Sequence, residues 1–307
     1  MPKNVLITGV AGFLGRYISR YYFEQGWNVV GLDAVSQENS PMVNLSAYHQ
    51  IQLPDPVLNT ILKSYNFEVC IHCAGRASVN LSVDDPGADF QSNTVVTFEL
   101  LNSLRVCSPD CRVVFLSSAA VYGNPKILPI KEGADIHPLS PYGFHKLHCE
   151  LICEEFSSIY GLSTASARIF SAYGPGLRRQ VIWDIFYKAL SEPRIKLQGT
   201  GVESRDFIHA EDIAKAIACI AQNAPMEGEV YNVASSSEVS IRDLAKLITT
   251  NISFDGIIEF DGKVPVGVPV NWQSDISKLK SLGFKPTISL EKGIKQFKKW
   301  AISEICK

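Results

Sequence analysis

The chain has 307 residues, of which 46% are hydrophobic and 20% are charged, with 29 Lys and Arg against 31 Asp and Glu. This composition is that of an ordinary soluble globular protein, and the length allows one large α/β domain or a domain with a smaller lobe. The net charge of −2, without a basic cluster, argues against nucleic-acid binding, and no apolar run approaches the ~18 residues of a transmembrane helix. Because Met1 is followed almost at once by a predicted strand, we expect no signal peptide and a cytoplasmic protein.

Short β-branched runs alternate with helical stretches over the first two thirds of the chain, which is typical of a parallel sheet with helices on both faces. The predicted strands are 4–8, 27–33, 69–73, 112–117 and 163–169, and the predicted helices are 13–25, 89–105, 142–160 and, near the end of the chain, 290–303. The polar segment 34–48 is expected to be irregular. The sequence therefore predicts a Rossmann-type doubly wound parallel sheet over residues 1–172. A smaller mixed α/β lobe is predicted over 173–307, with some segments free to return to the large sheet.

The eight cysteines do not form a metal-binding pattern. Cys70 and Cys73 have C-x-x-C spacing, which on its own suggests a redox or metal site. However, they lie within residues 67–74, a run that is typical of a buried strand, and no second pair follows at zinc-site spacing. Cys149 and Cys153 fall on the predicted helix 142–160, where small buried thiols are common. We therefore expect free structural cysteines and no metal site.

A glycine-rich loop connects the first predicted strand to the first predicted helix. Residues 8–15 have the spacing G-x-x-G-x-x-G, a variant of the dinucleotide-binding fingerprint. Glycines allow a tight turn and a close approach of a pyrophosphate, and the helix N-terminus offers unpaired N–H groups to its phosphates. The residues predicted to bind the cofactor here are Gly9, Gly12, Phe13, Leu14 and Gly15.

Asp33 ends the second predicted strand, 18 residues after Gly15. A carboxylate at this position can accept hydrogen bonds from the adenosine ribose of a dinucleotide, and it would repel the 2′-phosphate of NADP. No Arg follows Asp33 closely enough to reverse that preference. The sequence therefore predicts NAD as the cofactor.

Tyr142 and Lys146 lie four residues apart on the predicted helix 142–160, so their side chains share one face of it. A fixed positive charge near a phenol favours the phenolate, which can act as a base. Upstream, Ser118 supplies a hydroxyl at the end of the predicted strand 112–117. The spacing Tyr-x-x-x-Lys is common by chance, but together with the cofactor loop it predicts a catalytic set of Ser118, Tyr142 and Lys146.

With these motifs in order, the sequence resembles the extended short-chain dehydrogenase/reductase family. The resemblance is to its NAD-dependent nucleotide-sugar epimerase/dehydratase group, of the UDP-glucose 4-epimerase type. It runs nearly from end to end, and the segments that match family motifs are 8–15, 71–75, 168–176, 205–209 and 231–234. The resemblance implies further cofactor contacts from Cys73, Ala74, Gly75 and Asn93.

The resemblance also implies a mechanism. Tyr142, as phenolate, would remove the proton of a sugar hydroxyl, while Lys146 would hold it deprotonated and both would contact the cofactor. Ser118 would hydrogen-bond the reacting oxygen. The sugar carbon would pass hydride to NAD, and in an epimerase the hydride would return to the other face of the ketone. We therefore expect an NAD-dependent epimerase (an isomerase) of a nucleotide-diphosphate sugar, acting at C4.

The family also contains enzymes that catalyse other reactions. As the family is understood, 4,6-dehydratases carry an Asp-Glu pair after the catalytic hydroxyl, whereas this chain has Ala119 and Ala120, which disfavours dehydration. A reductase or dehydrogenase of a nucleotide (4-keto) sugar stays open, because residues 269–279 are compatible with such relatives. Against it, Asp33 disfavours the NADPH that reductases usually use. A non-catalytic dinucleotide-binding sensor is a third alternative, although it has no need of the catalytic set.

The substrate end departs from the family pattern. Ser171 stands where many relatives have an Asn that contacts the nucleotide diphosphate, and residues 263–268 lack an Arg that many relatives carry there. Arg205 is the candidate for the diphosphate, because a guanidinium matches paired phosphate oxygens. Arg178 and Arg179 are further candidates, and a solvated basic pair is the simpler interpretation for at least one of them. The nucleotide and the sugar therefore stay open.

The resemblance also bears on assembly. Family members often dimerise through a four-helix bundle that uses the helix carrying the Tyr and Lys and the helix before it. Leu147, Leu151 and Ile152 are apolar positions that permit such a homodimer, although core packing explains them equally well.

Overall fold

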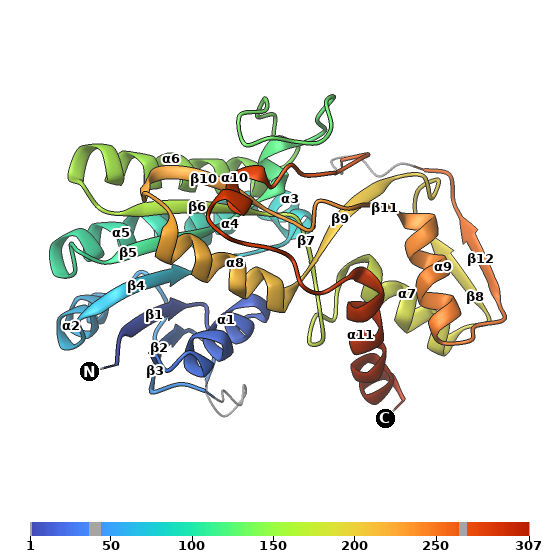
Figure 1. The fold of residues 1–307 in the computed structure, drawn as a ribbon, viewed down its shortest axis with the longest axis horizontal. Coiled ribbons are helices and arrows are strands. Elements are labelled where there is room, and N and C mark those ends of the chain that lie inside the picture. The colour runs from blue at the N-terminus through green and yellow to red at the C-terminus, as the bar shows by residue number, and fades with distance from the viewer. Residues whose placement is uncertain (1, 37–43, 264–268, 307) are drawn as a thin grey trace.

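The computed structural model describes residues 2–36, 44–263 and 269–306. Its largest feature is a parallel sheet of seven strands among the residues described, in the order β10-β6-β5-β4-β1-β2-β3 (Figure 1). The strands are β1 (Asn4–Thr8), β2 (Asn28–Asp33), β3 (Ala47–Gln50), β4 (Phe67–His72), β5 (Arg112–Ser118), β6 (Thr164–Ile169) and β10 (Glu227–Val233). The order reverses between β1 and β4, and ligands of such sheets bind at that point, beyond the carboxyl ends of the strands.

Helices cover both faces of this sheet, which confirms the doubly wound fold predicted from the sequence. One face packs on α1 (Phe13–Glu24) and α8 (Ala210–Asn223), and the other on α2 (Val57–Ser64), α5 (Val96–Cys107) and α6 (Pro141–Tyr160). Alternate residues of a strand point to opposite faces of the sheet. Val5 and Ile7 pack in the core under α1, while Leu6 packs in the core under α2. Because both faces are buried, the central strands such as β1 and β5 are rich in apolar residues, whereas the edge strand β3 is polar.

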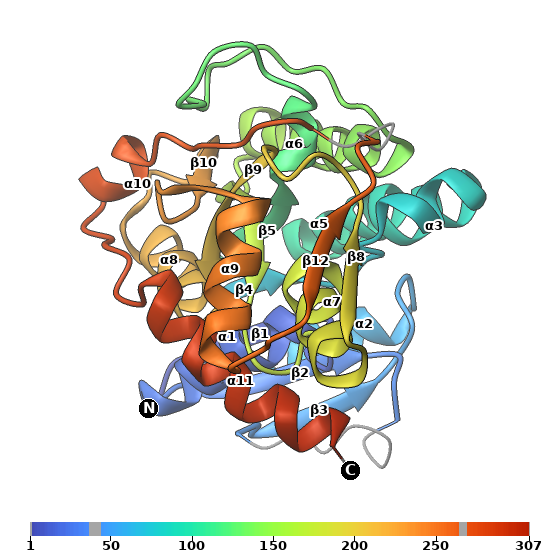
Figure 2. The same cartoon turned by 90° about the vertical axis from the view of Figure 1, so that its right-hand side faces the viewer.

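A smaller lobe lies at the carboxyl ends of the strands, beyond β7 (Figures 1 and 2). It contains the sheet β11-β9-β7 and the parallel pair β12-β8. The bounds are Ser171–Tyr173 for β7, Arg194–Leu197 for β8, Ser204–His209 for β9, Glu238–Ser240 for β11 and Ile257–Phe260 for β12. Three helices, α7 (Gln180–Ser191), α9 (Ile241–Asn251) and α11 (Leu290–Ile305), enclose its core, in which Phe186 stacks on Phe297 with ring centroids 5.2 Å apart.

The chain after residue 172 contributes to both lobes. It forms the smaller lobe, but α8 packs beside α1 and β10 pairs with β6 at the edge of the large sheet. The short α10 (Ser277–Ser281) lies near β10. No helix in the described ranges is both long and apolar enough to cross a bilayer.

Two segments differ from the local prediction. Ala47–Gln50, partly inside the segment expected to be irregular, forms strand β3, which pairs only with β2 at the sheet edge. The predicted helix 89–105 is divided into α4 (Pro86–Phe90), a π-helical turn η2 (Gln91–Val95) and α5. Neither change disturbs the sheet order, because the apolar face of α5 still packs on the core.

Candidate active site

The glycine loop after β1 is packed too tightly for any other residue type at two of its positions. Gly9 has φ +67°, and a Cβ there would lie 2.6 Å from the backbone nitrogen of Ala74, while a Cβ on Gly15 would lie 2.3 Å from the oxygen of Gly9. The loop, the end of β4 and the start of α1 therefore meet backbone to backbone. This packing leaves the first N–H groups of α1 available at the cavity.

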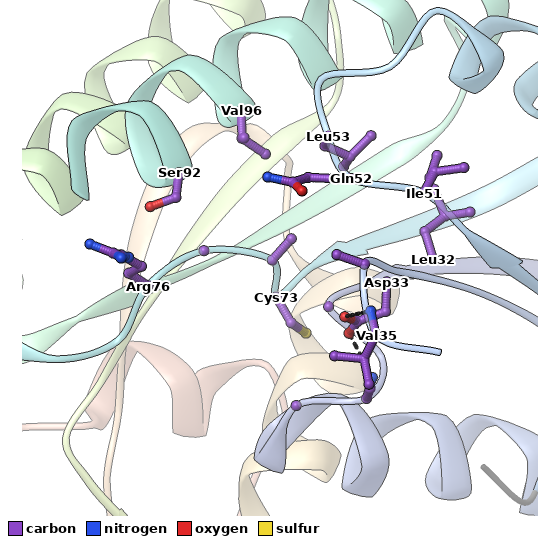
Figure 3. A pocket seen from close by; sticks show the side chains of 16 residues that line it. Leu32, Asp33, Val35, Ile51, Gln52, Leu53, Cys73, Arg76, Ser92 and Val96 are labelled. Carbon is purple, nitrogen blue, oxygen red and sulfur yellow. Dashed lines mark hydrogen bonds between the residues drawn. The ribbon is translucent and has the colours of Figure 1, made fainter. Parts of the chain in front are cut away.

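A cavity of about 460 Å³ opens beside this loop (Figure 3). Asp33 points into it at the end of β2, where its carboxylate accepts hydrogen bonds from the backbone N–H of Ala11 (2.9 Å) and of Val35 (3.2 Å). Other lining residues are Gly9, Gly12, Ile51, Gln52, Leu53, Cys73, Ala74, Gly75, Arg76, Ser92 and Val96. A glycine cradle, a helix N-terminus and an acidic residue at the next strand end together fit a dinucleotide whose ribose bears no 2′-phosphate.

Asn93 lies on the π-helical turn, directly behind Gly75. Its side chain is buried, and its Nδ2 donates to the backbone oxygen of Asp89 at 3.1 Å, while its Oδ1 has no hydrogen-bond partner among the described residues. A Cβ on Gly75 would lie 2.5 Å from that oxygen. The extra residue in the π turn thus places an unpaired amide oxygen against the cofactor loop.

A second, larger cavity of about 1190 Å³ continues from the first and brings Ser118, Tyr142 and Lys146 to one wall. Lys146 is 5% exposed, and its Nζ donates to the backbone oxygen of Leu116 at 3.1 Å and lies 5.9 Å from the centre of the Tyr142 ring. The ammonium is therefore held at a fixed place near the phenol. Ser118 ends β5, and its Oγ accepts a hydrogen bond from the backbone N–H of Ala120 at 3.2 Å.

The start of α6 sets the position of Tyr142. Ser140 caps the helix by accepting a hydrogen bond from Gly143 N at 3.2 Å, and Pro141 occupies the first helical position, where its missing N–H costs nothing. Tyr142 therefore falls in the first turn, and its backbone N–H donates to Ser82 Oγ on α3 (Val79–Asp84) at 3.0 Å. The cap and the Ser82 contact fix the backbone that carries the phenol.

Arg205 faces the same cavity from β9. Its Nη1 donates to the backbone oxygens of Ser204 (2.7 Å) and Val270 (3.0 Å), and its guanidinium lies 5.6 Å from the ring centre of Trp272. Burial lowers the pKa of Arg205 to about 10, and no carboxylate of the described residues lies within ion-pair distance of it. A half-buried cation that forms no ion pair with the described residues fits an anionic ligand.

The two neighbouring arginines lie in different places. Arg179 lines the cavity, and its Nη1 donates to the backbone oxygen of Ala77 at 2.5 Å. Arg178 is not among the lining residues: its guanidinium pairs with Glu304 on α11 and its side chain is 64% exposed. Ser171 lines the cavity, whereas residues 264–268, which lack the Arg of many relatives, lie outside the described residues.

Several lining residues carried no sequence signal. Residues 51–53 reach the cofactor cavity because β3 delivers the chain there, and Trp272 and Glu203 reach the larger cavity from the smaller lobe. Burial would raise the pKa of Glu203, but hydrogen bonds, chiefly from the N–H groups of Thr200 and Gly201, lower it below its ordinary value. The described residues contain no cluster of His, Cys, Asp or Glu placed to hold a metal ion.

The sequence matches the NAD dependent epimerase/dehydratase family over residues 5–234. The chain belongs to this family. A UDP-glucuronate 4-epimerase of Thermodesulfobacterium geofontis is 30% identical over 317 residues, covering 98% of this chain and 96% of that protein. Membership confirms the resemblance and identifies an NAD-dependent enzyme.

Solved structures agree over nearly the whole chain. A UDP-N-acetylglucosamine 4-epimerase from Methanobrevibacter ruminantium, in complex with UDP-N-acetylmuramic acid, has a TM-score of 0.89 at 30% identity and covers 99% of both chains. MoeE5, in complex with UDP-glucose and NAD, has a TM-score of 0.89 at 26% identity, covering 98% of this chain and 99% of that one. Both lobes, and therefore both cavities, fall within these matches.

Proposed function

We propose that this chain epimerises a nucleotide-diphosphate sugar at C4 through a transient 4-keto intermediate. The proposal is supported by one continuous site whose lining includes Ser118, Tyr142 and Lys146 together with the glycine loop and the half-buried cation of Arg205. The site thus has a place for a dinucleotide, a base and a diphosphate. The relatives named above as UDP-sugar 4-epimerases support the same reaction.

The side chains have distinct tasks in this reaction. Tyr142, as phenolate, takes the proton of the C4 hydroxyl, and the nearby ammonium of Lys146 stabilises the negative charge. Ser118 donates a hydrogen bond to the reacting oxygen and holds it near Tyr142. NAD held by the glycine loop and Asp33 would supply the hydride acceptor for C4 and, in its reduced form, the hydride donor to the opposite face of the ketone. As hydride returns to C4, Tyr142 gives its proton to the ketone oxygen, which forms the new alcohol and restores the phenolate.

The glycine loop, Asp33 and the strand-end residues Cys73–Gly75 would hold the dinucleotide, with Asn93 behind them. Arg205 would bind the diphosphate, and Arg179 and Ser171, which line the same cavity, would contact the substrate. Because Arg178 is engaged by Glu304 away from the lining, we leave it out of this site. UDP is the proposed nucleotide, on the names of the relatives.

The nearest alternative is net oxidation or reduction of the sugar with the same residues. Ala119 is fully buried, and neither Ala119 nor Ala120 can transfer a proton, which disfavours dehydration. A panel of UDP-, GDP-, CDP- and dTDP-sugars followed by NMR separates the reactions. We expect the C4 isomer of a UDP-sugar without net change in NADH absorbance. Stoichiometric NADH formation, or NADPH consumption with a 4-keto sugar, would establish the alternative instead.

We also propose a homodimer through α5 and α6. These neighbouring helices expose large apolar side chains, among them Phe98 (41%), Phe144 (48%) and Leu151 (53%). Exposed apolar side chains of this size on two neighbouring helices suit a helix-bundle interface. Light scattering should give twice the chain mass of 33.8 kDa, and Leu151→Glu should give monomers. A monomeric wild type would contradict this. The cytoplasmic location stays a prediction.

A further inference from the structure

A buried ion pair lies behind the catalytic residues, between α6 and the ends of two strands. The Glu150 carboxylate accepts hydrogen bonds from Arg168 Nε (3.0 and 3.1 Å) and Nη2 (2.7 Å), and both side chains are 4% exposed. Ser117 Oγ donates a further hydrogen bond of 2.5 Å to Glu150 Oε1. Ser117 on β5 and Arg168 on β6 are register partners, so the two donors reach Glu150 side by side.

The cluster extends to the neighbouring segments. Arg168 Nη1 donates to Tyr122 OH (2.9 Å) and to the backbone oxygen of Glu132 (3.0 Å), and Tyr122 OH donates to Asn232 Oδ1 on β10 (2.7 Å). Burial alone would lower the pKa of Arg168, but the hydrogen bonds and charge of Glu150 raise it above its ordinary value. The guanidinium therefore stays charged, with its hydrogen bonds directed to fixed partners.

Both ends of the cluster adjoin catalytic groups. Ser117 directly precedes Ser118 on β5, and Glu150 follows Lys146 by about one helical turn on α6. The contact of Glu150 with Ser117 and Arg168 therefore joins α6 to β5 and β6 directly behind the catalytic groups. A buried ion pair is weak evidence for stability, since apolar residues often serve a core as well.

We propose that Glu150, Arg168 and Ser117 are positioning residues: their buried cluster seats α6 on β5 so that Tyr142 and Ser118 engage the same substrate hydroxyl. The inference rests on the proposed function and concerns only the geometry of its site. A displacement of about 1 Å at such a site can cost about 100-fold in rate. Binding of nucleotide at Arg205 does not depend on this geometry, so it should be retained.

The test compares Ser117→Ala and Glu150→Gln with the wild type, using the nucleotide sugar that the wild type isomerises. The measured quantity is kcat per folded site, with sites counted by calorimetric titration with the nucleotide. We expect kcat per site to fall about 5- to 10-fold in Ser117→Ala and about 100-fold in Glu150→Gln, with KM within about 2-fold of wild type. A merely structural role would lower the number of sites and leave kcat per site unchanged.

Ser166→Ala is the matched control, because Ser166 is a fully buried serine on β6 outside this cluster. It should change kcat per site less than about 2-fold, in line with a mutation that removes no contact to the site. If Glu150→Gln does not fold, the kcat per site of Ser117→Ala alone tests the inference. Unchanged kcat per site in Ser117→Ala would overturn the inference. A wild type inactive on every nucleotide sugar would instead refute the proposed function.

Discussion

The backbone N–H of Ala11, inside the glycine loop, donates a 2.9 Å hydrogen bond to the carboxylate of Asp33. This contact ties the phosphate-binding loop to the residue expected to select the ribose. Figure 3 shows Asp33 in the cofactor cavity. Asp33→Asn keeps an oxygen for Ala11 but removes the charge that repels a 2′-phosphate. We expect the preference for NAD over NADP to fall by about 10-fold, equivalent to ~1.4 kcal/mol. Binding constants for both cofactors check this, and an unchanged ratio would show that Asp33 does not set the preference.

Gly15→Ala should abolish cofactor binding or folding. The new Cβ would lie 2.3 Å from the backbone oxygen of Gly9, and no flexible side chain can move to relieve that contact. Gly133→Ala is the control, because Gly133 is exposed and a Cβ there meets nothing within 4 Å. It should change the free energy of unfolding by less than ~0.5 kcal/mol. Thermal unfolding and NAD titration of both variants test the pair. A Gly15→Ala protein with normal affinity would contradict the packing described above.

Tyr142→Phe should lower kcat by about 10²- to 10⁴-fold, because the phenol is the base of the proposed reaction. Cofactor and nucleotide affinity should change little, since Phe keeps the ring in place. Tyr160→Phe, on the same helix but 49% exposed, should behave as wild type. Rate measurements with matched binding titrations distinguish loss of chemistry from loss of binding. An active Tyr142→Phe protein would refute the assignment.

Arg205→Gln should weaken nucleotide binding by about 10- to 100-fold, the effect of losing ~1.5–3 kcal/mol from hydrogen bonds to a charged group. Arg178→Gln is the matched control, because Arg178 pairs with Glu304 away from the cavity lining. It should alter the affinity for UDP less than about 2-fold, as expected of an exposed ion pair. Calorimetry with UDP measures both variants. An equal loss of UDP affinity in the two variants would show that Arg205 has no special role in binding the nucleotide.

Asp206 should make the protein less stable as the pH rises. Burial raises the pKa of Asp206 to about 6, against hydrogen bonds from Ser235 and Ser274 that lower it. Between about pH 4 and 6 the folded state therefore holds a proton that the unfolded state has released. This contribution is full below pH ~4 and lost above pH ~6, and it amounts to at most ~3 kcal/mol.

Asp206→Asn removes this titration. The loss of unfolding free energy between pH 4 and 7.5 should therefore be smaller in the variant than in the wild type, whatever its absolute stability. Asp275 offers the opposite case, because hydrogen bonds involving Ser277 lower its pKa, so its contribution is lost as the pH falls. Urea unfolding across this pH range checks both signs. Parallel wild-type and Asp206→Asn curves would contradict the raised pKa.

The elements that the sequence predicted best are the strands whose pattern has one cause, namely burial on both faces of the sheet. Apolar runs such as 4–8 and 112–117 became central strands because burial on both faces requires them to be apolar. Strand Ala47–Gln50 escaped prediction because its polar residues show no alternation and its pairing with β2 supplies the order. No local sequence pattern predicts the π-helical turn at Gln91–Val95. The turn lies where Asn93 packs against Gly75, which is a contact between segments that are separate in the sequence.

The residues of the candidate site also form two groups, those that the sequence could predict and those that it could not. Motif residues such as Gly15 and Tyr142 could be named because their chemistry depends on local spacing. Residues 51–53 could not, because only the path of the whole chain brings them to the cavity. Arg178 and Arg179 are adjacent and chemically identical, yet only Arg179 lines the cavity. The backbone at the start of α7 and the proximity of Glu304 to Arg178 account for this difference, and neither can be read from the sequence.

The pairing of β10 with β6 has a consequence for how the protein matures. A nascent chain that has reached residue 172 contains the whole predicted catalytic set, but the far edge of β6 has no neighbour until residues 227–233 are made. The carbonyls of Ala221 and Ala224, which accept hydrogen bonds from Arg112, also arrive late. An open edge strand is a site of aggregation. Residues 1–172 are therefore not an independent module, because α8 and β10 from later in the chain complete the larger lobe.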